Sequence, residues 1–147
     1  MDQNAKKRNE LLAQQMIKAL ESRNMEAYYA ENKEEALCKA LELMPEGSSV
    51  AWGGSMSVKE IGLIKAVHER NYEVYDRDLA KTPEERTEIT KKAFFSDFFL
   101  ASSNAITEDG ILVNIDGYAN RVAAIAYGPK NVLMIIGMNK VVRSEED

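Results

Sequence analysis

Two glycines and a serine, Gly53-Gly54-Ser55, have the composition of an anion-binding turn. They follow a short apolar run, Ser49 to Trp52, and precede a stretch with helical spacing of apolar residues. Glycines let backbone N–H groups approach a ligand without a Cβ in the way, and a helix N-terminus suits a carboxylate or phosphate. The spacing matches neither a Walker A loop nor a dinucleotide fingerprint. A ligand-binding turn and a plain strand-to-helix turn are therefore equally consistent with it.

A β-hairpin is predicted later in the chain. Asp109-Gly110 is typical of a two-residue type I′ turn, here between a strand from Phe98 to Thr107 and a strand from Ile111 to Ile115. Such a turn pairs Thr107 with Leu112, and side chains alternate between the two faces of each strand from there.

That register would gather polar side chains on one face of the hairpin. Ser103 would lie opposite Asp116, with Asn114 beside them. Polar groups on a strand pair cost desolvation unless they pair or bind something. For Asn114 we favour pairing within the protein. For Asp116 we favour a functional role, because Gly117 follows directly.

Arg121 has two interpretations. It could hold Asp116 in a charge-assisted pair, which is the commoner situation, or bind a substrate carboxylate bidentately. The segments together predict one small-ligand site. Its expected members are Gly53, Gly54, Ser55, Asn104, Asn120 and Arg121 as binding residues, with Asp116 and Glu108 as catalytic candidates.

The other reactive residues carry weaker signals. His68 is the only histidine and lies near the end of a predicted helix, so a role in packing is favoured over catalysis, and a metal site is less favoured still. Cys38 adjoins an apolar stripe and is expected to be a small buried side chain. Asp97 precedes a strand, where it could belong to a site, cap an element or face solvent.

Helices alternate with short strands along the chain, which predicts an α/β fold. A first amphipathic helix is expected over about 4–22, with Leu12 and Met16 on its apolar face, and docking to the domain is favoured over partner binding. Capping boxes predict helices that begin after Asn32 and Thr82. Overall we expect a mostly parallel sheet flanked by helices, with a late β-hairpin.

Several further elements are expected. Short strands are predicted over Met25–Ala30 and Asn131–Ile136, the second buried on both faces because it is almost continuously apolar. A capping box of Ser57 with Glu60 predicts another helix start. A helix over Tyr118–Tyr127 ends at Gly128-Pro129.

Composition limits the function classes. The chain has 147 residues, which predicts a single domain over 1–147. Its net charge of −5 disfavours nucleic-acid binding. A single cysteine excludes an internal disulfide and cysteine-paired zinc sites. There is neither an apolar run long enough for a membrane span nor a secretory signal at the start. We therefore expect a cytoplasmic protein without membrane insertion.

Several motifs resemble one protein family. Val50-Ala51-Trp52-Gly53-Gly54-Ser55-Met56-Ser57 resembles the glycine-rich segment of the LUD-domain (lactate utilisation) family. The stretch from Ser102 to Gly110, which reads Ser-Ser-Asn-Ala-Ile-Thr-Glu-Asp-Gly, is similar to its most recognisable part. The similarity continues through Asn114-Ile115-Asp116-Gly117, Asn120-Arg121-Val122-Ala123-Ala124, Gly128-Pro129-Lys130 and Gly137-Met138-Asn139-Lys140.

The resemblance implies an α/β fold of the CoA-transferase and ribose-5-phosphate-isomerase superfamily, with formyltetrahydrofolate cyclo-ligases as distant relatives. It also implies a role in oxidation of lactate to pyruvate, usually within a multi-protein system. It supplies no catalytic assignment and no cofactor. Two functions are carried forward: binding of a small anionic metabolite at the Gly-Gly-Ser turn, or a non-catalytic subunit that docks to an iron–sulfur redox partner.

The chain departs from the family in two places. Ala119 stands where family members often have glycine before the Asn-Arg pair. Similar stand-alone proteins also continue beyond the position of Asp147, into a cysteine-containing segment and a final strand. An open sheet edge invites pairing with a second copy, so we expect a homo-oligomer.

Overall fold

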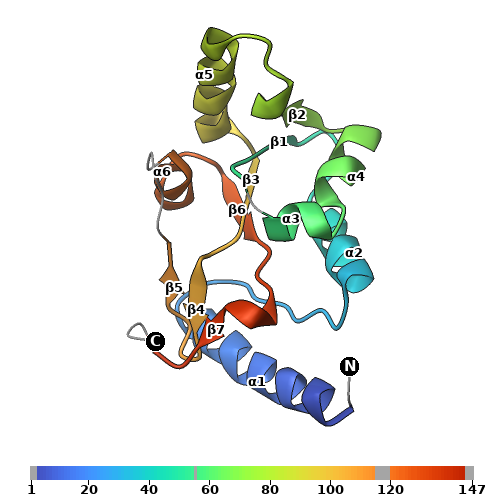
Figure 1. Cartoon of the computed structure of the whole chain (residues 1–147), viewed down its shortest axis with the longest axis vertical. Helices are drawn as coiled ribbons and strands as arrows, with labels where there is room; N and C mark the ends of the chain where they lie inside the picture. The colour runs from blue at the N-terminus through green and yellow to red at the C-terminus, as the bar shows by residue number, and fades with distance from the viewer. Residues whose placement is uncertain (1–2, 55, 115–119, 145–147) are drawn as a thin grey trace.

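The computed structural model describes residues 3–54, 56–114 and 120–144, and the side chains of residues 56 and 120–122 also lie outside the description. Figure 1 shows helices around a central sheet, with a smaller sheet and the first helix at one end. The elements in chain order are α1 (Gln3–Ser22), α2 (Lys33–Leu43), β1 (Ser49–Trp52), α3 (Met56–Glu60), α4 (Leu63–Glu69), β2 (Glu73–Tyr75), η1 (Arg77–Leu79), α5 (Pro83–Lys92), η2 (Ala93–Phe95), β3 (Phe98–Ala101), β4 (Ala105–Thr107), β5 (Leu112–Val113), α6 (Asn120–Ala126), β6 (Asn131–Met134), η3 (Met138–Lys140) and β7 (Val141–Val142).

The central sheet is parallel, as the sequence predicts. Its strand order is β2-β1-β3-β6. Val50 of β1 pairs with Val74 on one side and with Phe98 on the other, and Phe99 of β3 pairs with Val132 of β6. The α/β class with a mostly parallel sheet is confirmed.

Helices cover both faces of this sheet. Val50 and Trp52 point into one layer with α2, α3 and α4, where Val58 and Leu63 are fully buried. The intervening Ala51 points to the other face, which is covered by η2 and α6. Because side chains of a strand alternate, a strand buried on both faces is apolar at consecutive positions, as in Val50, Ala51 and Trp52 of β1, all of which are buried.

Two helix starts follow the predicted capping boxes. The Asn32 side chain accepts the Glu35 backbone N–H at 2.9 Å, and Thr82 does the same for Glu85 at 3.1 Å. Each glutamate side chain reaches back to the N–H of the residue before the cap, that is, Glu31 or Lys81, at 3.0 and 2.9 Å. Both starts are local in sequence, which is why the residue pattern predicts them.

The first helix docks to the domain, as favoured from its pattern. Ala13 and Met16 of α1 are buried. A Cβ at Gly110 would lie 3.3 Å from the Ala19 backbone, so the hairpin tip touches this helix directly. The Arg23 side chain also donates to the Asp109 carbonyl at 3.2 Å. Figure 1 shows α1 beneath the small sheet of order β5-β4-β7.

The predicted hairpin register is wrong by one residue. Ala105 pairs with Val113 and Ile106 with Leu112. Thr107 therefore stands opposite Ile111, and its N–H donates to the Ile111 carbonyl at 2.9 Å. The turn has three residues and ends at Gly110, whose φ is +89°. Three-residue hairpins with a left-handed last residue are a common alternative to type I′ turns, and a one-residue slip moves every side chain to the other face.

Other local expectations are also corrected. The strand predicted from Phe98 to Thr107 is two strands in different sheets, because residues 102–104 leave the central sheet. Met25–Ala30 forms no strand and connects α1 to α2. Cys38 is exposed. β6 is the edge strand of its sheet and is half-buried.

The helix expected after the glycine turn is divided. α3 begins at Met56, so Ser57 lies inside it and does not cap it. Gly62, with a positive φ, separates α3 from α4. The last predicted helix is present as α6, which ends at Ala126, one residue before the predicted end, while residues 118–119 lie outside the described residues.

A carboxylate joins β1 to β3 at the amino end of the sheet. Asp97 Oδ2 accepts the Ser49 N–H at 2.9 Å, and the Ser49 hydroxyl accepts the Asp97 N–H at 2.8 Å. The Lys130 ammonium lies 3.3 Å from Asp97 Oδ1. The Ser49 hydrogen bond and then Lys130 lower the pKa of Asp97. Asp97 therefore has a structural role at this edge.

We predict that Asp97→Ala lowers the Tm, because the buried Ser49 N–H loses its acceptor. The folded-state pKa lies below the ordinary value of about 3.9, so the ionised carboxylate stabilises the fold above that value. This contribution falls away as the pH drops through the folded-state pKa. In thermal melts from pH 7 to pH 2, the difference in Tm between Asp97→Ala and wild type should become smaller in acid. The exposed Glu46→Ala is the control, and a difference independent of pH would contradict the role of the ionised group.

Gly128 permits a close crossing of two segments. Its φ is +121°, and a Cβ at this position would lie 2.8 Å from the Phe94 carbonyl oxygen. The chain thus turns from α6 into β6 directly against η2. Any side chain at residue 128 would have to displace backbone.

We predict that Gly128→Ala costs roughly 2–4 kcal/mol of unfolding free energy, because backbone strain and a steric clash add. Gly47→Ala is the matched control. Gly47 also has a positive φ, of +90°, but nothing lies within 4 Å of the place that a Cβ would take, so about 1–2 kcal/mol is expected there. Urea denaturation compares the two. If both variants lost the same unfolding free energy, the contact of residue 128 with Phe94 would contribute nothing to the cost of Gly128→Ala.

Candidate functional site

The central sheet has a topological switch between β1 and β3. From β1 the chain goes through α3 and α4 to β2 on one side, whereas from β3 it goes through α6 to β6 on the other. Connections that leave in opposite directions open a crevice beyond the carboxyl ends of the two strands, where open α/β sheets bind ligands. The Gly53-Gly54 turn directly follows β1 and lies at this edge.

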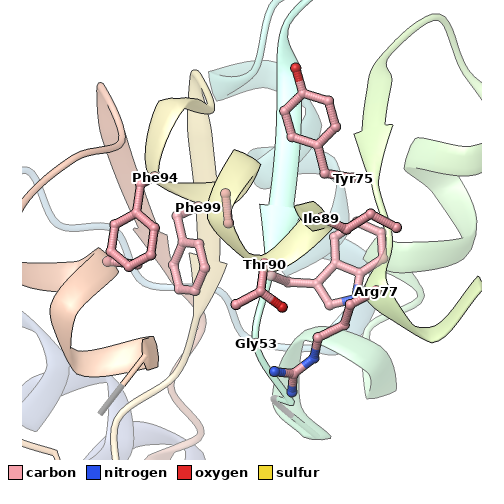
Figure 2. Close-up of a pocket in the computed structure, with 10 residues that line it drawn as sticks. Gly53, Tyr75, Arg77, Ile89, Thr90, Phe94 and Phe99 are labelled. Carbon is pink, nitrogen blue, oxygen red and sulfur yellow. The ribbon is translucent and has the colours of Figure 1, made fainter. Parts of the chain in front are cut away.

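A cleft lies at this edge on the side of α5 and α6 (Figure 2). We call it the Arg77 cleft. Its walls come from the ends of β1 and β2, from the middle of β3, and from η1, α5, η2 and α6. The lining residues are Trp52, Gly53, Tyr75, Arg77, Ile89, Thr90, Ala93, Phe94, Phe99 and Ala124.

Arg77 is the cation of the cleft. It follows β2 by two residues and opens the short helix η1. Within the part of the chain that the structure describes, its Nε atom is buried without a hydrogen-bond partner. A buried donor without a partner costs free energy, and an arginine is permanently charged in proteins. The guanidinium therefore has unused capacity to bind an anion.

The neighbouring carboxylates are engaged elsewhere. Asp76 lies 2.9 Å from His68 Nε2 and accepts the Asp78 N–H at 2.9 Å. Asp78 lies 3.8 Å from Arg86. The acidic residues on either side of Arg77 thus bond to other groups and leave its charge for a ligand.

The glycine turn faces the guanidinium. A Cβ built on Gly54 would lie 3.5 Å from Arg77 Nη2, and Gly54 itself is exposed. Its φ lies outside the left-handed range, so the backbone does not require glycine there. The absence of a side chain instead keeps the approach to the guanidinium open.

The interior of the cleft is narrow. Its free volume is about 10 Å³, roughly the space of one water molecule. Phe94 and Phe99 supply aromatic walls, and Figure 2 shows their rings beside each other. The arrangement admits a small group into an apolar interior while a charged group remains at Arg77.

Tyr75 lines the cleft with its ring rather than its hydroxyl. Figure 2 shows the phenol oxygen directed away from Arg77. Burial, followed by the Glu73 side chain, raises the pKa of Tyr75. The phenol is therefore neutral at pH 7 and places no negative charge against an anionic ligand.

The structure brings some of the predicted site residues together. Gly53 lines the cleft and Gly54 stands at its mouth, while Ser55 lies outside the described residues. Asn104 is exposed three residues beyond the end of β3, where its N–H donates to the Val113 carbonyl of the hairpin, and it does not line the cleft. The helix after the turn has only five residues, so its dipole contributes little and Arg77 supplies the positive charge.

Other predicted residues lie apart or outside the description. Glu108 is in the hairpin tip, where its N–H donates to the Val142 carbonyl at 3.0 Å. Four residues of strand place it roughly 13 Å from Asn104, toward α1. Asp116 lies outside the described residues, as do the side chains of Asn120 and Arg121. Ala124, one turn after Arg121 on α6, lines the cleft.

Arg77 was missed in the sequence, although a signal for it exists. It follows the strand that neighbours β1, and carboxyl ends of parallel strands meet at one edge. Applying that rule to Tyr75-Asp76-Arg77 as well as to Gly53-Gly54 would have brought the arginine into the predicted site.

The described residues contain no group of three or more His, Cys, Asp or Glu side chains placed to hold a metal ion. None of the helices within those residues is long and apolar enough to cross a membrane.

Comparison with known proteins gives one match. A family model described as "LUD domain" matches residues 13–147, which is nearly the whole chain. No curated protein and no solved structure matches.

Proposed function

This chain belongs to the LUD-domain family, which is associated with lactate utilisation proteins, and on that premise we propose that it binds a small anionic metabolite in the Arg77 cleft. The observation that carries the proposal is the buried, unpartnered Nε of Arg77 within the described residues, beside an exposed glycine turn. A guanidinium binds a carboxylate or phosphate through two parallel hydrogen bonds.

The shape of the cleft limits the ligand. Its free volume of about 10 Å³ accommodates one small group, so the remainder of the ligand lies at the mouth near Gly54. A short hydroxy or keto acid fits with its carboxylate on Arg77 and its carbon end toward the aromatic walls. A phosphorylated metabolite fits with its phosphate on Arg77 and the remainder outside.

Residues after the hairpin are proposed to complete the site. Asn104 follows the end of β3, and α6, which begins with Asn120 and Arg121, borders the cleft through Ala124. Asp116 is proposed to orient the ligand or exchange protons with it. Glu108 has no place in this site because the hairpin carries it toward α1.

We predict that Arg77→Gln weakens anion binding at least tenfold, because a hydrogen bond to a charged group contributes about 1.5–3 kcal/mol. Trp52 is the only tryptophan and lines the cleft, so its fluorescence reports binding. Titrations with L-lactate, pyruvate and inorganic phosphate separate the two ligand classes. Gly54→Val should also weaken binding, because its side chain would crowd the guanidinium.

Arg8→Gln is the matched control for this prediction. It removes the same charge from an exposed arginine on α1 that does not line the cleft, and it should leave the affinity unchanged. If Arg77→Gln binds every probe as wild type does, the proposed site is wrong.

The second candidate function is a non-catalytic subunit that docks to an iron–sulfur redox protein. Two exposed aromatic side chains favour it. Phe95 is 83% exposed and Tyr127 is 87% exposed. Each lies next to one partner of the close Phe94–Gly128 contact, so the two segments that carry them are adjacent. Failure of the wild-type protein to bind any of the three anions would favour this candidate over the first.

We also propose that the chain self-associates. β6 borders the central sheet and β7 borders the small one, and each has a partner strand on only one side among the described residues. Unpaired backbone groups at a sheet edge favour strand addition from a second copy. Size-exclusion chromatography with light scattering should give a dimer or larger species. A monomeric mass at high protein concentration would contradict this.

A further inference from the structure

We propose that His68 is a positioning residue for Arg77. It acts through Asp76, which holds the short helix η1 that carries the arginine. This inference rests on the proposed function, because it assigns His68 and Asp76 to the support of the same anion site. His68 does not line the cleft, so its role is positioning and not catalysis.

The first step is the contact between the histidine and the carboxylate. His68 Nε2 lies 2.9 Å from Asp76 Oδ2. An ionised carboxylate only accepts hydrogen bonds, so the imidazole N–H donates. The Asp76 side chain is 9% exposed and the His68 side chain 35% exposed. The aspartate is thus shielded from solvent, and a hydrogen bond in such surroundings is stronger than one in water.

The second step leads from Asp76 to the helix that carries Arg77. Asp76 Oδ1 accepts the Asp78 N–H at 2.9 Å and so caps η1, which runs from Arg77 to Leu79. None of these three residues is buried, and Leu79 is 69% exposed. A three-residue turn has little stability of its own. Its position therefore depends on the cap.

The third step fixes the imidazole itself. The Trp52 and His68 rings meet edge to face, with centroids 5.7 Å apart and an interplanar angle of 87°. Trp52 is 5% exposed and belongs to β1, directly before the glycine turn. His68 is therefore held between a rigid strand and Asp76. The same tryptophan lines the cleft, so both ends of this chain of contacts meet at the site.

The contacts give one path from α4 to the anion. Trp52 orients His68, His68 orients Asp76, Asp76 caps η1, and η1 presents the Arg77 guanidinium to Gly54. Removing the imidazole frees Asp76 to rotate, which weakens the cap and lets Arg77 leave its place. Affinity is lost without removal of any group that touches the ligand.

The experiment compares His68→Ala with His68→Gln in titrations followed by Trp52 fluorescence, with inorganic phosphate and pyruvate as probes. We expect His68→Ala to weaken binding about tenfold. His68→Gln should restore most of that loss, because its amide nitrogen reaches the position of Nε2. Asp76→Ala should reproduce the loss. Glu69→Ala, an exposed neighbour paired with Lys65 only at 4.0 Å, is the matched control and should bind as wild type does.

A double variant separates positioning from general damage to the fold. In an Arg77→Gln background, His68→Ala should cause no further loss of affinity, because its effect passes through Arg77. Equal losses in both backgrounds would overturn the inference, and so would wild-type affinity in His68→Ala. Failure of His68→Gln to recover any affinity would also overturn it.

Hydrogen exchange keeps the inference testable if wild type binds neither probe. That result would remove the proposed function. His68→Ala should still accelerate exchange of the backbone amides of residues 78–80 relative to α4, because Asp78 donates to Asp76. Unchanged exchange there would overturn the positioning role on its own. If His68→Ala does not fold, His68→Gln is compared with wild type instead. We then expect near-wild-type affinity for the probes and unchanged amide exchange at residues 78–80. Weaker binding together with faster exchange in His68→Gln would overturn the proposal.

Discussion

The pairing of β1 between two parallel neighbours determines the form of the whole molecule. Val50 is bonded in register with Val74 on one side and Phe98 on the other, so β1 is buried on both faces and along both edges. The connections on its two sides must then cross opposite faces of the sheet. This places α3 and α4 in one layer with α2, and η2 and α6 in the other. The crevice at the carboxyl edge follows from the same geometry.

Sequence reasoning succeeded where the cause is local. Asn32 with Glu35 and Thr82 with Glu85 fix helix starts through contacts only three residues apart. The short run from Ser49 to Trp52 predicts a strand, and β1 has these bounds. The burial on both faces predicted for Asn131–Ile136 is wrong, because that depends on neighbouring strands, and β6 has a neighbour on only one side among the described residues. The family and the α/β class followed from motifs and from the alternation of elements, while the wider superfamily suggested by the resemblance stays a prediction.

It failed where a distant contact decides between two locally reasonable conformations. Asp109-Gly110 fits a type I′ turn, in which both residues have positive φ. In the structure α1 lies against the hairpin tip, and of these two residues only Gly110 adopts the left-handed conformation. The strand predicted from Phe98 to Thr107 overlooked a local signal, because Ser102-Ser103-Asn104 is typical of a loop, and Ala101 ends one sheet while Ala105 begins another. Arg77 was missed because its approach to Gly54 brings together two strand ends that are distant in the sequence.

The two ends of the sheet use similar groups to different effect. At the amino end, the Asp97 carboxylate holds the Ser49 N–H and has Lys130 as its cation, so charge and hydrogen bonds are balanced within the chain. At the carboxyl end, the Asp76 carboxylate also holds a backbone N–H, but its other partner is His68 and not the adjacent Arg77. An Asp76–Arg77 pair would have balanced the charge locally and stabilised the edge. Because His68 and not Arg77 pairs with Asp76, the guanidinium is left for the anion that we propose, and binding of that anion would return the stability that an Asp76–Arg77 pair would have given.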